Sequence, residues 1–158
     1  MENQAGGTMK TGLVLEGGAM RGMYTAGVMD IFMEEGFAFD GIIGVSAGAL
    51  FGVNYLSGQK GRVIRYNKRF NAEPDYLGLR PLLRTGNIVD TEYAYHRVPY
   101  ELDVFDDAAY RASGVPFYAV VTNVENGMPE YIQVNSVFEQ MDVLRASGSM
   151  PFVSKPVE

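Results

Sequence analysis

The chain has 158 residues, 47% of them hydrophobic, which is enough to bury the core of one domain. Only 20% are charged and the net charge is -6, so the strong positive field that holds nucleic acid is absent and we expect no nucleic-acid partner. The lack of cysteine excludes disulfides, thiolate metal sites and a cysteine nucleophile.

The N-terminal stretch is polar and contains no apolar run of the secretory type. We interpret residues 1–8 as a disordered tail or a tag remnant and expect the folded unit to occupy residues 9–158. We expect a cytoplasmic protein. No apolar segment reaches the roughly 20 residues that cross a bilayer, so any membrane contact would be peripheral.

The first third predicts alternating strands and helices. Residues 11–15 form an apolar run that ends in a glycine loop, and residues 23–35 carry apolar side chains at helical spacing before Gly36. Residues 41–45 predict a second strand, and residues 47–56 follow it at once as an apolar helix. This order favours an α/β fold, with a parallel or mixed sheet sandwiched by helices.

The remainder is less regular. Residues 60–111 predict a cap or surface segment that starts with a basic helix over residues 60–70. Two strands, 116–124 and 128–134, flank Asn126-Gly127 and predict a hairpin. A short helix over residues 139–146 and a small-residue loop over residues 147–151 follow.

The clearest chemical motif is a G-x-S-x-G pattern at the junction of the second strand and its helix. Alone this pattern is weak, but a strand-to-helix turn is the context in which it forms a nucleophile elbow, with the serine strained and its hydroxyl clear of the sheet. The helix N-terminus favours developing negative charge there. We therefore predict Ser46 as the nucleophile and its neighbours as the elbow: Gly44, Val45, Ala47 and Gly48.

A small-residue loop directly follows the first strand. Backbone N–H groups in such a loop can hold the oxyanion of a tetrahedral intermediate, each donor contributing roughly 3 kcal/mol. The residues predicted to form this oxyanion loop are Gly17, Gly18, Ala19, Met20, Arg21 and Gly22.

A nucleotide loop is the alternative for this segment. A phosphate-binding P-loop ends in Gly-Lys-Ser/Thr, whereas this loop continues as Gly22-Met23-Tyr24. The dinucleotide fingerprint also fits poorly, because Ala19 replaces the middle glycine and Asp40 precedes the second strand.

These motifs resemble those of the patatin-like phospholipases: a G-G-x-x-[RK]-G loop, then G-x-S-x-G, then a small-residue and proline block, here residues 146–152. The resemblance implies hydrolysis of a lipid or acyl-ester substrate by a Ser-Asp dyad, without metal or organic cofactor. One departure is Ala19, where family members often carry glycine. Alanine retains the N–H, so we expect the oxyanion hole to survive if φ is negative at this residue.

A second departure concerns the base. The family's aspartate lies in an Asp-Gly-Gly or Asp-Gly-Ala motif, which is absent here. We expect the chain to be the N-terminal portion of a longer hydrolase, with the base beyond Glu158 and the fold incomplete on that side. Asp40-Gly41 is interpreted as a polar turn. The other aspartates are interpreted as solvated surface: Asp30, Asp75, Asp90, Asp103, Asp106, Asp107 and Asp142.

Two further residues are candidates for the site. His96 is the one histidine and lies in a polar helical stretch, so a surface position is favoured over a catalytic triad. Arg21 is expected to pair with an acid that holds the loop, or alternatively to bind a phosphate headgroup. Two rival functions remain open, a serine acyltransferase and a non-catalytic anion-binding or regulatory protein of the same fold.

Overall fold

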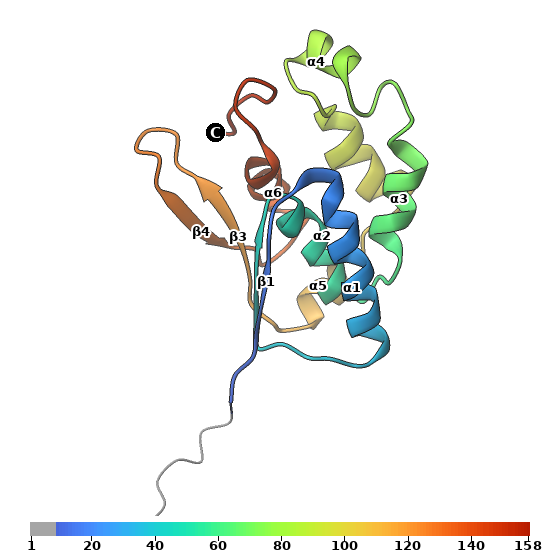
Figure 1. The fold of residues 1–158 in the computed structure, drawn as a ribbon, viewed down its shortest axis with the longest axis vertical. Helices are drawn as coiled ribbons and strands as arrows, with labels where there is room; N and C mark the ends of the chain where they lie inside the picture. Colours follow the sequence, from blue (N-terminus) through green and yellow to red (C-terminus); the bar gives the residue numbers. More distant parts are fainter. Residues whose placement is uncertain (1–8) are drawn as a thin grey trace, which may run out of the picture.

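A computed structural model describes residues 9–158. Its centre is a mixed sheet of four strands in the order β1 (Gly12–Leu15), β2 (Gly41–Val45), β3 (Phe117–Thr122) and β4 (Pro129–Gln133). The first three strands are parallel, and β4 pairs with β3 in antiparallel register (Figure 1). The predicted α/β class with a mixed sheet flanked by helices is confirmed.

Helices α1 (Gly22–Glu34), α2 (Ala47–Leu56) and α3 (Arg62–Phe70) lie to one side of the sheet (Figure 1). The shorter α5 (Asp107–Ala112) and α6 (Met141–Gly148) lie at opposite ends of α2 in the same view. Among the described residues, no helix is both long enough and apolar enough to span a membrane.

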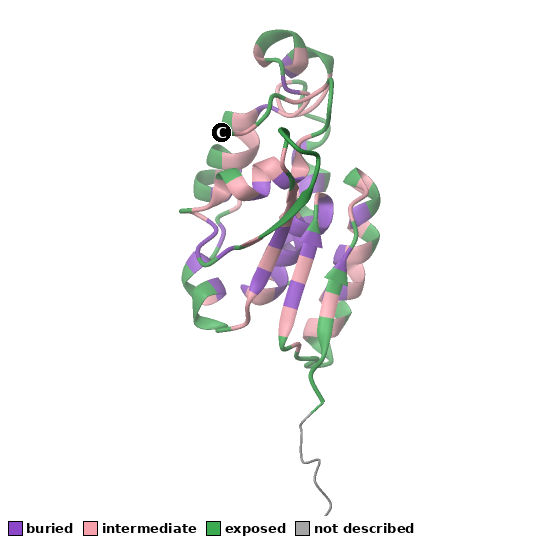
Figure 2. Ribbon diagram, turned by 90° about the vertical axis from the view of Figure 1, so that its left-hand side faces the viewer, coloured by how far each residue is buried: buried purple, intermediate pink, exposed green. Residues whose placement is uncertain are grey.

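The core lies between the sheet and α2. Side chains alternate along a strand, and the row that faces the helices contains the buried Leu15, Ala119 and Phe117. Buried and less buried positions alternate along the strands in Figure 2. On the opposite row Val14 is 74% exposed, although parallel strands are usually buried on both faces.

The middle of the chain contains one helix that was not predicted and a π-helix that overlaps the helical stretch predicted around His96. Helix α4 (Leu79–Thr85) is short and starts after Gly78, whose φ of 128° suits glycine. A π-helix, η2 (Tyr93–Leu102), contains Pro99. Proline has no N–H to donate, and the Asp103 N–H reaches five residues back to the Val98 carbonyl at 2.9 Å.

The predicted hairpin is present, but its loop is longer than an Asn-Gly turn alone. Only Gly127 has a positive φ, 72°, and its N–H donates to the Asn123 carbonyl. The Asn126 side chain accepts from the Met128 N–H at 2.8 Å. At the next element the prediction of a loop over residues 147–151 is wrong in part, because α6 continues through Ser147 and Gly148.

Candidate active site

The turn between β2 and α2 holds Ser46 in a strained conformation. Ser46 has φ 52° and ψ -119° and directly precedes the first turn of α2, where its carbonyl accepts from the Ala49 and Leu50 N–H groups. A non-glycine residue in this region costs about 1–3 kcal/mol, so the surrounding packing must impose the conformation. The result is a serine at the positive end of a helix dipole.

Two glycines allow this turn to form. A Cβ on Gly44 would lie 2.6 Å from the Gly48 carbonyl oxygen, and a Cβ on Gly48 would lie 2.2 Å from the Leu15 carbonyl oxygen. Both neighbours are backbone atoms that cannot move aside without shifting an element. The spacing of the G-x-S-x-G motif therefore reflects close approach of α2 to β1 and to the end of β2.

The glycine loop after β1 lies against the serine. A Cβ on Gly17 would be 3.0 Å from the Ser46 Cβ. The loop then forms a short 3-10 helix, η1 (Ala19–Arg21). Within residues 9–158 the backbone N–H groups of Gly18 and Ala19 donate to no protein acceptor, so both can bind an anion. The condition that was set for Ala19, a negative φ, is not met: φ is 47° where the chain turns between β1 and α1.

The other residues of the predicted loop occupy different environments. Met20 faces the same cavity as Ser46. Gly22 begins α1 and packs against the Ala47 Cβ and the Phe51 ring, where any side chain would clash. Arg21 is exposed, and the expected acidic partner is not found among residues 9–158.

Ser147 holds the elbow in place, a role that the sequence did not reveal. Its hydroxyl accepts from the Ser46 N–H at 2.8 Å and donates to the Val120 carbonyl at 2.7 Å, joining α6 to the ends of β2 and β3. The only signal in the sequence was the position of Ser147 in the small-residue block near the C-terminus.

We expect Ser147→Ala to lower the free energy of unfolding by about 1–2 kcal/mol, because the Ser46 N–H loses its acceptor. We expect kcat for ester hydrolysis to fall about tenfold through misorientation of Ser46. Ser147→Thr, which keeps a hydroxyl, should recover most of kcat. Ser149→Ala is the matched control, since the Ser149 hydroxyl donates to Arg145 and not to the elbow. An equal fall in kcat in Ser147→Ala and Ser149→Ala would contradict the role of Ser147 in positioning Ser46.

An apolar cavity of about 340 Å³ opens beside Ser46. Helices α2, α3, η2 and α6 form its walls, and Ala19 and Met20 of the glycine loop contribute to the same cavity. The predicted cap segment is therefore the outer wall of this cavity. The residues of α2 and η2 that line it are Ala47, Leu50, Phe51, Val53, Ala94, Tyr95, Val98 and Pro99.

Two aspartates that were predicted at the surface are buried, Asp90 and Asp107, and the side chain of a third, Asp103, is only 7% exposed, which corrects that interpretation. Asp90 accepts from the Tyr93 N–H and from Arg84. Asp107 accepts from the Val137 N–H at 2.6 Å, and Asp103 pairs with arginines of α3. Each carboxylate is compensated by hydrogen bonds or ion pairs. The arginine partners of Asp103 and the Val137 partner of Asp107 are distant in sequence, whereas the partners of Asp90 lie three and six positions away.

No described residue is in position to act as the general base. The Ser46 hydroxyl has no hydrogen-bonded carboxylate or imidazole within residues 9–158, and neither Asp, Glu nor His lines the cavity there. Asp40 accepts from the Thr11 N–H and precedes β2, whereas Ser46 follows β2, so the strand separates them by roughly 17 Å. His96 is exposed, as predicted, and stacks on Tyr100.

Comparison with known proteins agrees with this geometry. The family model of patatin-like phospholipases matches residues 13–158. The uncharacterized protein YjjU of Escherichia coli strain K12 is 31% identical over 142 residues, which are 88% of this chain and 40% of YjjU. The chain thus spans less than half the length of that relative. It belongs to the patatin-like phospholipase family.

Proposed function

We propose that this protein is a serine hydrolase of fatty-acyl esters, with phospholipid or lysophospholipid as the favoured substrate class. The observation that supports it most strongly is the arrangement at one end of the cavity. Ser46, strained at the start of α2, shares an apolar cavity with the loop whose Gly18 and Ala19 N–H groups have no protein acceptor. An acyl chain fits the apolar cavity, and its carbonyl would lie between the serine and these donors.

In this mechanism the Ser46 Oγ attacks the ester carbonyl carbon as a base takes the hydroxyl proton. The Gly18 and Ala19 N–H groups bind the oxyanion of the tetrahedral intermediate. The C–O bond to the alcohol then breaks and the alcohol leaves with the proton. Water attacks the acyl-serine by the same route and releases the fatty acid with free Ser46.

We assign the base to an aspartate outside these 158 residues. This rests on the absence of a suitable carboxylate or imidazole beside Ser46 in residues 9–158, and on the greater length of YjjU. General-base assistance contributes about 10²- to 10⁴-fold in rate. The experiments below therefore use the full-length protein.

Peripheral contact with a lipid surface is supported by α4. Leu79 and Leu83 lie one helical turn apart and are 75% and 87% exposed. Arg80 and Arg84 of the same helix carry positive charge, although both pair in part with Asp75. The segments beside α4 contribute Leu77 and Ile88 to the cavity, so a membrane-bound α4 would bring lipid close to it.

Gly17→Ala should reduce kcat/KM by about 10²-fold, because the new Cβ would lie 3.0 Å from the Ser46 Cβ and 3.3 Å from the Val45 carbonyl oxygen. Gly12→Ala, in the strand β1 that precedes the loop, is the matched control, because the added Cβ meets only the Gly41 oxygen at 3.8 Å. Steady-state hydrolysis of p-nitrophenyl octanoate measures kcat/KM of the two variants. Equal activity of the two variants would count against contact between the loop and the nucleophile.

The hydrolase and its rivals differ in where the acyl group goes. Purified full-length protein is incubated with a lysophospholipid and glycerol, and the products are quantified by mass spectrometry. We expect free fatty acid as the main product. A predominance of acylglycerol would identify an acyltransferase, and no turnover of any ester by folded protein would support a non-catalytic protein.

A further inference from the structure

The apolar cavity contains a buried cation far from Ser46. Arg62 of α3 lines the cavity together with Tyr66 and Asn67 of the same helix. The Arg62 side chain is only 5% exposed. A charge is rarely buried in an apolar pocket without compensation. The hydrogen-bond partners of Arg62 therefore decide whether this residue only stabilises the fold or can also bind a ligand.

The protein uses only part of the hydrogen-bonding capacity of Arg62. Nη1 donates to the Asn54 side-chain oxygen at 2.8 Å, Nε donates to the Asp103 carbonyl at 3.1 Å, and Nη2 also donates to that carbonyl. A guanidinium has five N–H groups. Among the described residues, two N–H groups therefore have no protein acceptor.

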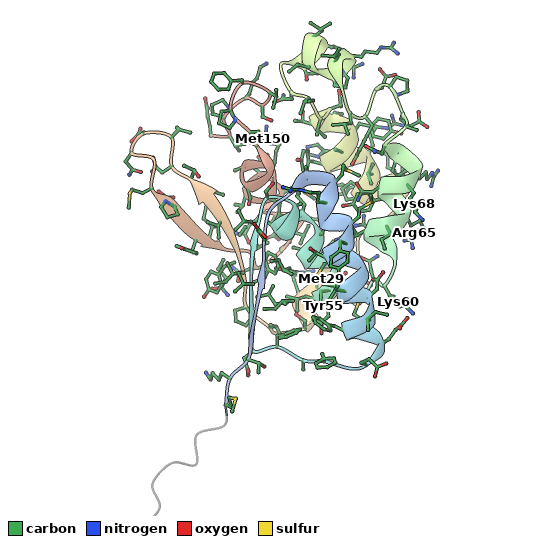
Figure 3. The ribbon with its side chains drawn as sticks, viewed as in Figure 1. Met29, Tyr55, Lys60, Arg65, Lys68 and Met150 are labelled. Carbon is green, nitrogen blue, oxygen red and sulfur yellow. The ribbon has the colours of Figure 1, made fainter. Side chains whose placement is uncertain are left out.

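The charge of Arg62 is also only partly balanced. The Asp103 carboxylate lies 3.3 Å from Arg62 Nε, but it forms two hydrogen bonds of 2.8 Å with Arg65. Arg65 is 56% exposed and lies on the outer side of α3 with Lys68 (Figure 3). Burial lowers the pKa of Arg62, while Tyr66 and Asp103 raise it, and a guanidinium remains protonated at neutral pH.

Two phenol groups add further donors to the same cavity. Tyr76 and Tyr95 line it, and no hydrogen bond to another described residue involves either hydroxyl. Burial raises the pKa of each to about 12, so both stay neutral and can donate an O–H. The cavity thus combines an apolar wall with a buried cation and neutral donors.

The depth of the cation suits a medium-length chain. Asn54, which binds Arg62, lies two turns beyond Ser46 along α2, a distance of about 12 Å at about 1.5 Å per residue. An extended carbon chain with C–C bonds of about 1.5 Å covers this distance in roughly eight to ten carbons.

We propose that the cavity selects acyl groups of about eight to ten carbons that carry a hydrogen-bond acceptor oxygen at the far end, bound by Arg62 and the phenol of Tyr76. A terminal carboxylate is the preferred acceptor, because charge-assisted hydrogen bonds are the strongest. This inference rests on the proposed function, since it assumes that the acyl group enters from Ser46.

The test compares three p-nitrophenyl esters of equal carbon count in the full-length protein: octanoate, 8-hydroxyoctanoate and the half-ester of octanedioic acid. We expect kcat/KM to be about tenfold or more higher for the octanedioate than for octanoate, with the hydroxy ester between them. The ratio of kcat/KM for the octanedioate to kcat/KM for octanoate, measured on one enzyme preparation, is independent of the fraction of folded protein. A ratio of one or below in the wild type would overturn the proposal.

Substitutions test whether Arg62 causes the preference for the octanedioate ester over the octanoate ester. Arg62→Met should abolish it, whereas Arg65→Met, which removes the other guanidinium on Asp103, should retain it. Because Arg62→Met leaves Asp103 buried and can unfold the protein, Tyr76→Phe provides a milder test and should lower the preference about threefold. Retention of the full preference in both Arg62→Met and Tyr76→Phe would overturn the proposal.

Failure of the proposed function gives a different result. If octanoate is hydrolysed without any preference, the hydrolase stands and the selectivity fails. If no ester is hydrolysed, the proposed function fails. Calorimetric titration with monomethyl octanedioate and with methyl octanoate then measures the affinity of the cavity for each ligand. Tighter binding of the acid in wild type but not in Tyr76→Phe would support the subsite, and equal binding would refute it.

Discussion

Ser46→Ala should abolish ester hydrolysis by the full-length protein, with a loss of about 10³-fold or more, because no nucleophile remains to form the acyl-enzyme. The fold should persist. The Ser46 N–H keeps its bond to Ser147, and the Ser46 hydroxyl makes no hydrogen bond with any described residue. Initial rates with p-nitrophenyl octanoate and a thermal melt of the same preparation measure the two effects.

Ser46→Gly is the matched control for this experiment. It also lacks the hydroxyl but relieves the positive φ of 52°. After the entropic cost of glycine, we expect a gain of about 1 kcal/mol, or about 2–4 °C in Tm for a protein of this size. Hydrolysis by either variant at more than a few per cent of the wild-type rate would exclude Ser46 as the nucleophile.

Gly48→Ala should destabilise the protein by at least about 3 kcal/mol. The added Cβ would lie 2.2 Å from the Leu15 carbonyl oxygen, 2.6 Å from its carbon and 2.9 Å from the Glu16 carbonyl oxygen. Because these are backbone atoms, α2 must move away from β1 and the elbow must deform. Urea unfolding monitored by circular dichroism measures the change, and hydrolysis should be lost as well.

Gly27→Ala makes the same substitution within α1, where nothing lies within 4 Å of the added Cβ. This variant should gain about 0.5–1 kcal/mol from helix propensity. The contrast separates a steric clash from a general response to alanine. A Gly48→Ala protein as stable as Gly27→Ala would show that α2 does not approach β1 as described.

The strands and helices around Ser46 could be predicted from the sequence. The predicted ranges 41–45 and 47–56 coincide with β2 and α2, since a short apolar run, a glycine-flanked turn and a long apolar run leave few alternatives. These features are local, so a linear pattern contains them.

The features missed by sequence analysis depend on contacts between distant residues. Ser147 meets Ser46 across 101 positions, and Arg62 meets Asp103 across 41. Nothing in the local pattern distinguishes a buried aspartate that accepts several hydrogen bonds from a solvated one. The cavity is likewise assembled from helices and loops that are far apart in the sequence, so its polar lining appears only after the chain has folded.

The most direct test of Ser46 as the catalytic nucleophile is covalent labelling of the full-length protein with a fluorophosphonate probe, followed by peptide mapping by mass spectrometry. We predict one adduct per chain, on the Ser46 hydroxyl, with no labelling of Ser46→Ala and undiminished labelling of Ser149→Ala. An adduct on another residue, or no adduct on a protein that hydrolyses esters, would contradict the assignment of Ser46 as the nucleophile.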